Sequence, residues 1–355
     1  MEKFSQFRDR GSGIAPFLPI PSESLGLQAP LRIFLFFFRL PLFIFVTLTY
    51  FVILQWLPIG SLGKKAALWC ILGVPSIWWI DLQVDGVKKG YGRSVRASSR
   101  FKKLIIRVIH SSLSKHQQAR LPQPGSVIAS SFTSPIDAVY LAAIFDPVFT
   151  AAYPNTRQVE RISLLQAILR AFAAPRVQPT PGTKLYDLAT LVEKYPNRPI
   201  VVFPECTTTN GRGILPLSHA LLSVPSKTKV FPVSLRYTPV DVVTPIPGSY
   251  ISFLWTLLSK PTHCIRVRIA ECVMNNRGSI DAPPARSTRQ STYNSNYLDT
   301  LEQDTTEGGV TAAERAFLDQ VGESLARLGR VKRVGLGVKE KQEFVRMWTK
   351  TRSTW

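Results

Sequence analysis

The longest apolar run of the chain lies near its amino terminus, from Ile33 to Leu57, and its only charged residue is Arg39, followed by Pro41. A helix of this length covers roughly 37 Å, enough to cross the hydrocarbon core of a bilayer with some tilt. A buried core helix is the alternative, but a run so rich in Phe and so poor in small residues favours contact with lipid. The pattern predicts a transmembrane or deeply inserted helix.

A second apolar stretch follows from Ala66 to Ile80 and carries three tryptophans. It is short for a membrane span, and Trp favours the membrane interface, so it predicts a short second leg or a helix lying on the surface. We therefore assign residues 1–30 to a mostly extended polar lead segment and 31–82 to a membrane anchor, either one span or a hairpin.

The segment Gly86–Lys103 contains seven basic residues and no acidic one. We assign 83–120 to a basic linker, and the positive-inside rule places everything after it in the cytosol. Contact with anionic lipid would contribute on the order of 1 kcal/mol per basic residue near the surface. A solvated linker whose charge only sets the topology is equally compatible with the pattern.

Between 121 and 275 the pattern alternates between strand-like and helical segments, which predicts an α/β domain with a mixed, largely parallel sheet flanked by helices. The expected strands are Val127–Ser131, Ile200–Phe203, Val230–Leu235 and Ile265–Ile269. The expected helices are Pro135–Phe145, Leu164–Ala174 and Leu185–Tyr195. Pro232 within a strand-like run predicts an edge strand or a bulge.

The remaining carboxyl-terminal residues fall into two parts. Residues 276–310 are polar and rich in Ser, Thr and Asn, which is typical of a loop or disordered insertion. Residues 311–355 contain one helical segment, Ala312–Leu328, followed by a basic tail.

The charge balance narrows the class of partner. Lys and Arg number 44 against 23 acidic residues, a net charge of +21, which indicates an anionic partner. We find no helix-turn-helix, zinc-finger or RNA-recognition pattern, so we expect a membrane and anionic lipid and no nucleic acid. The four Cys and four His do not pair at ligand spacing, so no metal is expected.

Ser134, Pro135 and Asp137 stand where a strand runs into a helix. A hydroxyl at the N-cap, a proline at the first helical position and a carboxylate at the third form a capping box. The capping role alone explains Asp137, so this segment proves no chemistry by itself.

A second polar segment follows the buried strand that ends at Phe203 and contains Glu205, Thr207 and Arg212. Ligand sites of α/β proteins lie at such strand ends, and Arg212 is suited to pair with a phosphate. The alternative is an ordinary Asn-Gly turn with a solvated arginine.

These segments, in this order, resemble the conserved blocks of the plsC-type glycerophospholipid acyltransferases. Ser131–Asp137 stands where that family has Asn-His-x-Ser-x-x-Asp, and Phe203–Thr207 where it has Phe-Pro-Glu-Gly-Thr. Val230–Leu235 resembles the fourth block, and Thr156–Arg161 resembles the second block weakly. The opening residues, MEKFSQFRDRGSGIAPFLPIP, resemble a fungal branch of lysophosphatidic acid:oleoyl-CoA acyltransferases linked to lipid droplets and vacuolar protein sorting.

The resemblance implies transfer of a fatty acyl chain from acyl-CoA, as co-substrate, to lysophosphatidic acid or a related lysophospholipid. The product would be phosphatidic acid for glycerolipid and triacylglycerol synthesis, at the endoplasmic reticulum membrane or the lipid droplet. It implies Asp137 as a catalytic residue, orienting the family's general base. The substrate-binding residues that it implies are Ser134, Arg161, Glu205, Thr207 and Arg212.

Two positions depart from the family pattern. Phe132 stands where the family has its general-base His, which leaves Asp137 acting through water, or His219, as substitutes. Cys206 replaces a Gly, which suggests that this position needs neither positive φ nor close approach of a ligand. A covalent thioester on Cys206 is disfavoured because no His neighbours it. A non-catalytic lipid-binding scaffold and a basic membrane adaptor without a small-molecule site are the alternatives.

Overall fold

The computed structural model describes residues 2–22, 26–57, 60–85, 120–275 and 310–353. Most of the predicted basic linker (83–120) and nearly all of the predicted polar loop (276–310) lie outside these residues, so those two predictions stay predictions.

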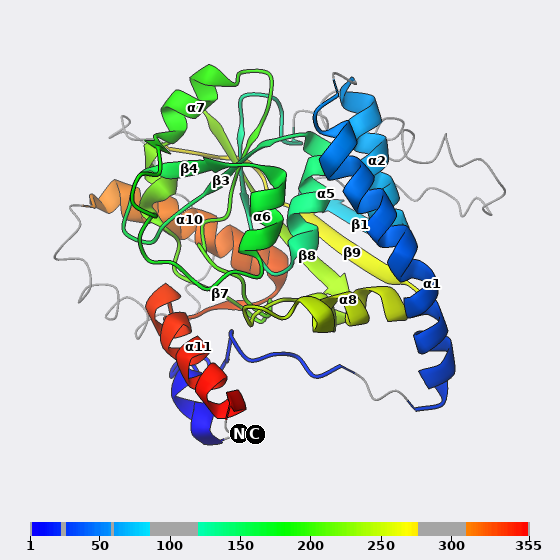
Figure 1. Ribbon diagram of the computed structural model, residues 1–355. Helices are drawn as coiled ribbons and strands as arrows, with labels where there is room; N and C mark the ends of the chain where they lie inside the picture. Colours follow the sequence, from blue (N-terminus) through cyan, green and yellow to red (C-terminus); the bar gives the residue numbers. More distant parts are fainter. Residues whose placement is uncertain (1, 23–25, 58–59, 86–119, 276–309, 354–355) are drawn as a thin grey trace.

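The centre of the molecule is a mixed sheet with the strand order β1-β9-β8-β2-β6-β3-β4-β5, with β10 also paired to β8 (Figure 1). Its strands are β1 (Ile77–Val84), β2 (Val127–Ser130), β3 (Val148–Ala151), β4 (Val159–Ile162), β5 (Leu185–Tyr186), β6 (Ile200–Val202), β8 (Lys229–Thr238), β9 (His263–Ile269) and β10 (Val273–Met274). The central strands β8, β2, β6 and β3 run parallel, whereas β8 with β9, β3 with β4 and β4 with β5 are antiparallel. The predicted mixed, largely parallel α/β class is confirmed.

Pro232 lies in β8, a central strand paired with β2 on one side and β9 on the other, so the edge-strand alternative is wrong. Its carbonyl accepts a hydrogen bond from the Ala270 amide at 2.9 Å. Pairing with β9 begins at Val233 and pairing with β10 ends at Val230, so the proline nitrogen faces the interruption between the two partners. The lost N–H therefore costs no ladder hydrogen bond.

Helices cover both faces of the sheet. Side chains of α5 (Pro135–Phe145), α6 (Leu164–Arg170) and α8 (Tyr250–Ser259) pack with one set of strand residues. Those of α7 (Leu188–Lys194), α10 (Ala312–Gly329) and the 3-10 turn His219–Ser223 pack with the other set. Along β8 the alternation is direct, because Phe231, Val233 and Leu235 face the α5 side while Val230 faces the α10 side.

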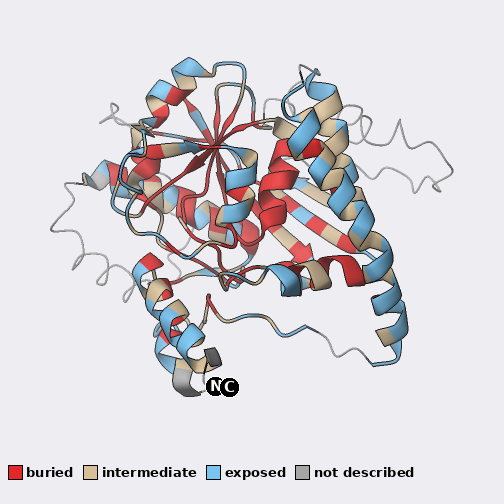
Figure 2. Cartoon of the chain, in the orientation of Figure 1, coloured by how far each residue is buried: buried red, intermediate tan, exposed pale blue. Residues whose placement is uncertain are grey.

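The amino-terminal apolar run forms α1 (Ala29–Leu48), continued by a π-helical turn over Thr49–Leu54. The helical segment Gly26–Leu54 contains an apolar stretch of which only 6% of the residues are buried. Among the described residues it is the one helix that is long and apolar enough to cross a membrane. Figure 2 shows its exposed surface beside the buried sheet and α5. The buried-core-helix alternative is thereby excluded, and membrane association is supported.

Arg39, the charge within this run, is satisfied by the folded domain. Its guanidinium donates to the Lys260 carbonyl at 2.6 Å and to the Ser76 hydroxyl at 2.7 Å, and also contacts the Leu258 and Pro261 carbonyls. The three carbonyls lie at the carboxyl end of α8, where a cation is favourable to the helix dipole, and Ser76 lies just before β1. Arg39 therefore docks α1 on the domain.

The second apolar stretch is divided between two elements. α2 (Ser61–Gly73) packs against α5, and β1 begins at Ile77 and pairs in parallel with β9. The expected single helix over 66–80 is therefore wrong in its second half, because the β-branched and aromatic residues there complete the sheet edge. β1 also crosses the predicted boundary at 82, so the folded domain begins before the linker.

The two ends of the chain meet (Figure 1). The 3-10 helix Glu2–Phe7 packs on α11 (Val338–Ser353), and Phe7, Phe17 and Phe344 form a small buried cluster. A two-stranded sheet joins β7 (Gly213–Ile214) to β11 (Lys332–Arg333). The lead segment is thus folded rather than mostly extended, and the basic tail is a helix packed on the domain.

Candidate active site

The first-block segment forms the N-terminus of α5, as its residues predict. The Asp137 carboxylate accepts hydrogen bonds from the backbone amides of Thr133 at 2.7 Å and Ser134 at 2.9 Å, completing the capping box. The Tyr237 hydroxyl donates to its other oxygen. Burial raises the pKa of Asp137 to about 6, and these hydrogen bonds act in the opposite direction. Both carboxyl oxygens of Asp137 therefore accept hydrogen bonds from groups within the fold.

Phe132, at the position of the missing His, joins the first block to the third. Its ring stacks on Phe203 with centroids 4.3 Å apart and planes 24° apart, and it is 4% exposed. The backbone carbonyl of Phe132 accepts from the Thr209 amide at 3.1 Å. At the position where the family has its general base, this chain therefore has a side chain that packs the first and third blocks together.

Glu205 is buried under the third block, with one oxygen accepting from the Leu215 amide at 3.1 Å. Its other oxygen has no hydrogen bond to any described residue. Burial raises the pKa of Glu205 to about 8, which outweighs the backbone N–H groups and the nearby Lys341 that lower it. Asp137 lies near enough to raise that pKa further, so the two predicted acidic residues do converge.

Lys341 of α11 is a site residue that sequence reasoning missed. Its ammonium group is fully buried and contacts the Thr207 hydroxyl at 2.9 Å, the Thr208 carbonyl at 2.5 Å and the Thr208 hydroxyl at 3.0 Å. Burial lowers the pKa of Lys341 to about 7, and the charge of Glu205 partly restores it. The sequence signal was a lysine on the apolar face that includes Val338 and Phe344.

The amino-terminal lead holds the same loop from the other side. The Asn210 side chain donates to the Ala15 and Leu18 carbonyls at 2.8 and 2.9 Å, and its amide donates to the Pro16 carbonyl at 2.9 Å. Gly211, with φ +71°, completes the turn. Both chain ends therefore fix the conformation of the third block.

A cavity of about 240 Å³ opens between the two blocks. Its walls include Phe132, Phe203, Cys206 and Thr207, together with small residues of the α6 end. It lies where β2 and β6 end, the edge at which α/β proteins bind ligands. The cavity thus combines an aromatic floor with a hydroxyl held by Lys341.

Two arginines that the sequence did not single out give this cavity positive charge. Arg170 of α6 contacts Glu160 at 3.1 Å and Tyr153, whereas Arg176 contacts the Thr180 hydroxyl at 2.9 Å. Among the described residues Arg176 forms no ion pair with a carboxylate. The cavity therefore has a cation available for an anionic group.

The predicted substrate-binding residues separate into two groups. Ser134 caps α5 and is fully buried, Glu205 lies beneath the loop, and Thr207 lines the cavity. Arg161 does not face it: Glu160 and Ile162 line the cavity, so strand alternation turns Arg161 outward, over the ring of Tyr195. Arg212 is exposed and also does not line it. Arg161 and Arg212 therefore lie away from the cavity, and their substrate-binding roles stay predictions.

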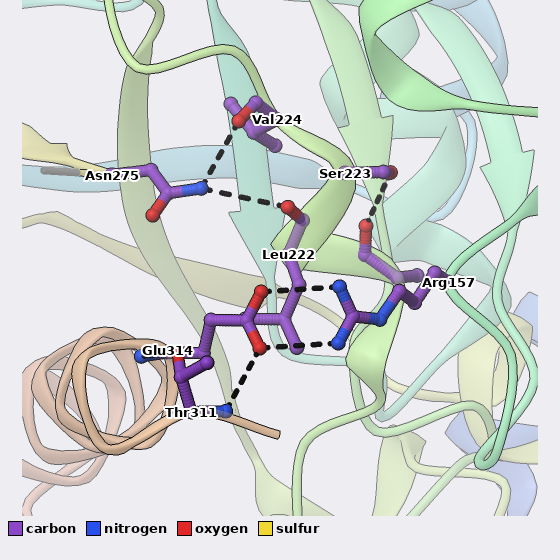
Figure 3. A network of polar contacts seen from close by, with 8 residues as sticks. Arg157, Leu222, Ser223, Val224, Asn275, Thr311 and Glu314 are labelled. Atoms are coloured by element: carbon purple, nitrogen blue, oxygen red, sulfur yellow. Dashed lines mark hydrogen bonds and ion pairs between the residues drawn. The ribbon is translucent and has the colours of Figure 1, made fainter. Parts of the chain in front are cut away.

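His219 does not replace the missing base. It lies on the α10 side of the sheet, and the charges that act on it are those of Arg157 and Glu314. Figure 3 shows these two side chains in a paired contact, with both nitrogen–oxygen distances 3.1 Å. That ion pair ties the weak second-block segment to the start of α10, so this region serves packing rather than the cavity.

Cys206 adopts φ +58°, the left-handed region that glycine occupies without strain. The expectation that this position needs no positive φ is wrong, because the turn after Glu205 requires it and the cysteine accepts the strain. Burial raises the pKa of the Cys206 thiol to about 12, which disfavours a thiolate nucleophile. Among the described residues no group of three metal ligands occurs.

Comparison with known proteins agrees with this geometry. A family described as Acyltransferase matches residues 112–236, which contain both blocks and the cavity. A Schizosaccharomyces pombe protein, named provisionally as a lysophosphatidic acid:oleoyl-CoA acyltransferase, is 27% identical over 278 residues, 76% of this chain and 84% of that protein. Lysophosphatidic acid:oleoyl-CoA acyltransferase 1 of Saccharomyces cerevisiae is 28% identical over 227 residues, 61% of each chain. Residues 112–236 thus match the Acyltransferase family, and the chain is similar to these two fungal proteins over most of its length.

Proposed function

We propose that the chain transfers a fatty acyl group from acyl-CoA to lysophosphatidic acid and forms phosphatidic acid. The observation that carries the proposal is the cavity between the first and third blocks, which pairs apolar aromatic walls with the cations Arg170 and Arg176. A phosphate monoester suits a guanidinium, since the two groups form charge-assisted hydrogen bonds. Arg176 is therefore the residue that we assign to the acceptor phosphate.

The acyl chain enters from the side of α1. Phe172, directly after α6, contacts Tyr250 and Phe253 of α8 with ring centroids 4.6 and 5.3 Å apart. α8 in turn packs against α1, where Phe36 meets Trp255. This continuous apolar surface joins the exposed helix to the cavity wall, and it favours an acyl donor held beside the membrane.

We assign the proton transfer to Thr207 and Lys341. The acceptor hydroxyl oxygen attacks the thioester carbonyl carbon, the C–S bond breaks, and CoA leaves as a thiolate. The hydroxyl proton passes to the Thr207 oxygen while the Thr207 proton passes to neutral Lys341, 2.9 Å away. Lys341 later returns a proton toward the thiolate. A pKa of about 7 leaves part of Lys341 neutral at physiological pH.

The cellular setting belongs to the same proposal. The exposed apolar helix α1 supports membrane association. A product used for triacylglycerol synthesis agrees with a place at the endoplasmic reticulum membrane or the lipid droplet, with the sheet domain facing the cytosol. The net charge of +21 favours an anionic leaflet.

The test is transfer of labelled oleate from oleoyl-CoA to lysophosphatidic acid by the purified full-length chain, followed as labelled phosphatidic acid. Arg176→Gln should raise KM for lysophosphatidic acid by about tenfold, since one charge-assisted contact is lost. Arg161→Gln is the matched control, because that arginine faces away from the cavity, and it should behave as the wild type.

Two results would reject the assignment in different ways. Lysolipid binding without any transfer would favour the lipid-binding scaffold, with the Phe132–Phe203 stack in place of a base as its reason. If Arg176→Gln transfers the acyl group with an unchanged KM, the proposed reaction still holds, but Arg176 is not the residue that contacts the phosphate.

A further inference from the structure

A second cavity, of about 170 Å³, lies on the opposite face of the sheet from Asp137. Its wall contains four arginines, two from β9, one from β8 and one directly after α10: Arg236, Arg266, Arg268 and Arg330. The Tyr237 side chain, one residue further along β8, turns to the other face and meets Asp137. The two cavities are therefore separated by the thickness of the sheet.

The register of the strands places like charges side by side. Arg236 of β8 stands directly opposite Arg266 of β9, and Arg268 is the next residue of β9 on the same face. Like charges directly opposite each other on neighbouring strands destabilise a sheet. Burial lowers the pKa of Arg236, and the charges of Arg268, Arg266 and Arg330 lower it further, as mutual repulsion would.

The surrounding groups relieve only part of this repulsion. Arg236 donates to the Gly329 carbonyl at 2.6 Å and Arg268 to the Leu328 carbonyl at 2.8 Å, so each uses part of its guanidinium on the end of α10. Asp81 of β1 is in register with Arg266 and brings one negative charge to this face. Among the described residues none of the four arginines forms an ion pair.

We propose that this arginine cavity binds a phosphate-bearing anion at a site separate from the acyl-transfer cavity. Several guanidinium forks around one concave site match the oxygens of a phosphomonoester or diphosphate, and the Ser234 hydroxyl adds a donor. The anion removes the repulsion that the register creates. The proposal does not depend on acyl transfer, because it uses none of the residues of the first cavity.

The test uses sodium pyrophosphate as the probe, titrated into the detergent-solubilised full-length chain at constant ionic strength and followed by calorimetry. The wild type should bind pyrophosphate saturably, with one equivalent at the arginine cavity. The double variant Arg266→Gln, Arg330→Gln should bind at least about tenfold more weakly, since two charge-assisted contacts are removed. The side chains of these two arginines are exposed and make no hydrogen bond to α10 in the described structure, so the thermal midpoint should change little.

Two matched variants separate a site from general basicity. Arg315→Gln removes the same charge from an exposed position near the other end of α10 and should leave pyrophosphate binding unchanged. Arg176→Gln reports the first cavity, whose proposed ligand also carries a phosphate, and it should leave the equivalent bound at the arginine cavity unchanged. The proposal is overturned if the wild type shows no saturable binding, if Arg315→Gln weakens binding as much as the double variant, or if only Arg176→Gln does.

Vesicle flotation identifies the source of the phosphate. One set of phosphatidylcholine vesicles contains phosphatidic acid and the other contains phosphatidylserine adjusted to equal surface charge. If the double variant loses only the preference for phosphatidic acid, the ligand is a lipid headgroup. If flotation is unchanged while pyrophosphate binding is lost, the site takes a soluble phosphate compound. Unchanged behaviour in both assays would refute the site.

Discussion

The first and third blocks each bury one carboxylate, yet the two are held in opposite ways. Asp137 has both oxygens bonded, by two amides within four residues of it and by Tyr237. Glu205 has one bonded oxygen, and the loop around it is held by Asn210 contacts to the amino-terminal lead and by Lys341 from α11. The first block is a local structure, whereas the third depends on segments distant in the chain.

From this difference we propose that the chemistry lies in the third block. A carboxyl group whose two oxygens are both hydrogen-bonded within the fold, and which does not line the cavity, holds its surroundings in place and is poorly placed to meet a reactant. The third block instead presents Thr207 to the cavity, with a lysine whose pKa lies near neutrality behind it. The following variants test that division.

Lys341→Met should have the largest effect. Loss of the proton acceptor should lower kcat for acyl transfer by about 10²–10⁴-fold, the usual contribution of a general base. Lys341→Arg should lose as much, because a guanidinium stays protonated. The wild-type rate should rise as pH increases through about 7, since the base must be neutral, and this rise should vanish in Lys341→Arg.

Lys339→Met is the matched control, an exposed lysine on the same helix whose loss should leave kcat unchanged. A Lys341→Arg enzyme with full activity and an unaltered pH profile would show that Lys341 only anchors α11. In that case the third block, like the first, would stabilise the fold and take no part in proton transfer.

Asp137→Asn should destabilise the fold more than Glu205→Gln does. Asparagine retains one acceptor oxygen and turns an NH₂ group toward the remaining donors, so we expect a loss of about 3 kcal/mol in the free energy of unfolding. Glutamine at 205 keeps an oxygen for the Leu215 amide, and at pH 7 the loss should be about 1 kcal/mol. Denaturant titration of both variants decides the order; equal losses would contradict the comparison.

The pH dependence of stability isolates Glu205. Its folded pKa of about 8 lies above the ordinary value of 4.5, so the folded state binds more protons than the unfolded state between them. This contribution is therefore complete at acid pH and is lost as pH rises toward the folded pKa. Glu205→Gln removes it, so the wild type's advantage over the variant should shrink by about 2 kcal/mol between about pH 5 and about pH 7. A pH-independent difference would show that Glu205 is not protonated in the fold.

The sequence predicts local structure well and structure that depends on distant segments poorly, which is the same difference as between the first and third blocks. The α5 start, its capping box and the strands β2, β6 and β9 depend on neighbouring residues, and each is confirmed within one or two residues of its ends. Lys341, the folded lead segment and the pairing of β1 with β9 depend on contacts across more than a hundred residues. No local pattern reports such contacts. Arg161 was named from a weak resemblance in the second block, and strand alternation turns its side chain away from the cavity.

Cys206→Gly should have the smallest effect and the opposite sign. A left-handed conformation costs a non-glycine residue about 1–2 kcal/mol, and glycine relieves it at φ +58°. Loss of the partly buried side chain and the greater freedom of the unfolded chain offset part of that, so we expect a gain of about 1 kcal/mol in the free energy of unfolding. Cys206→Ala is the control, because it removes the thiol but keeps the strain and should not stabilise. Acyl transfer should persist in both variants, since burial raises the pKa of the Cys206 thiol to about 12 and so keeps it protonated. Loss of transfer in both would restore Cys206 as a covalent acyl carrier and move the chemistry from Thr207 to its neighbour.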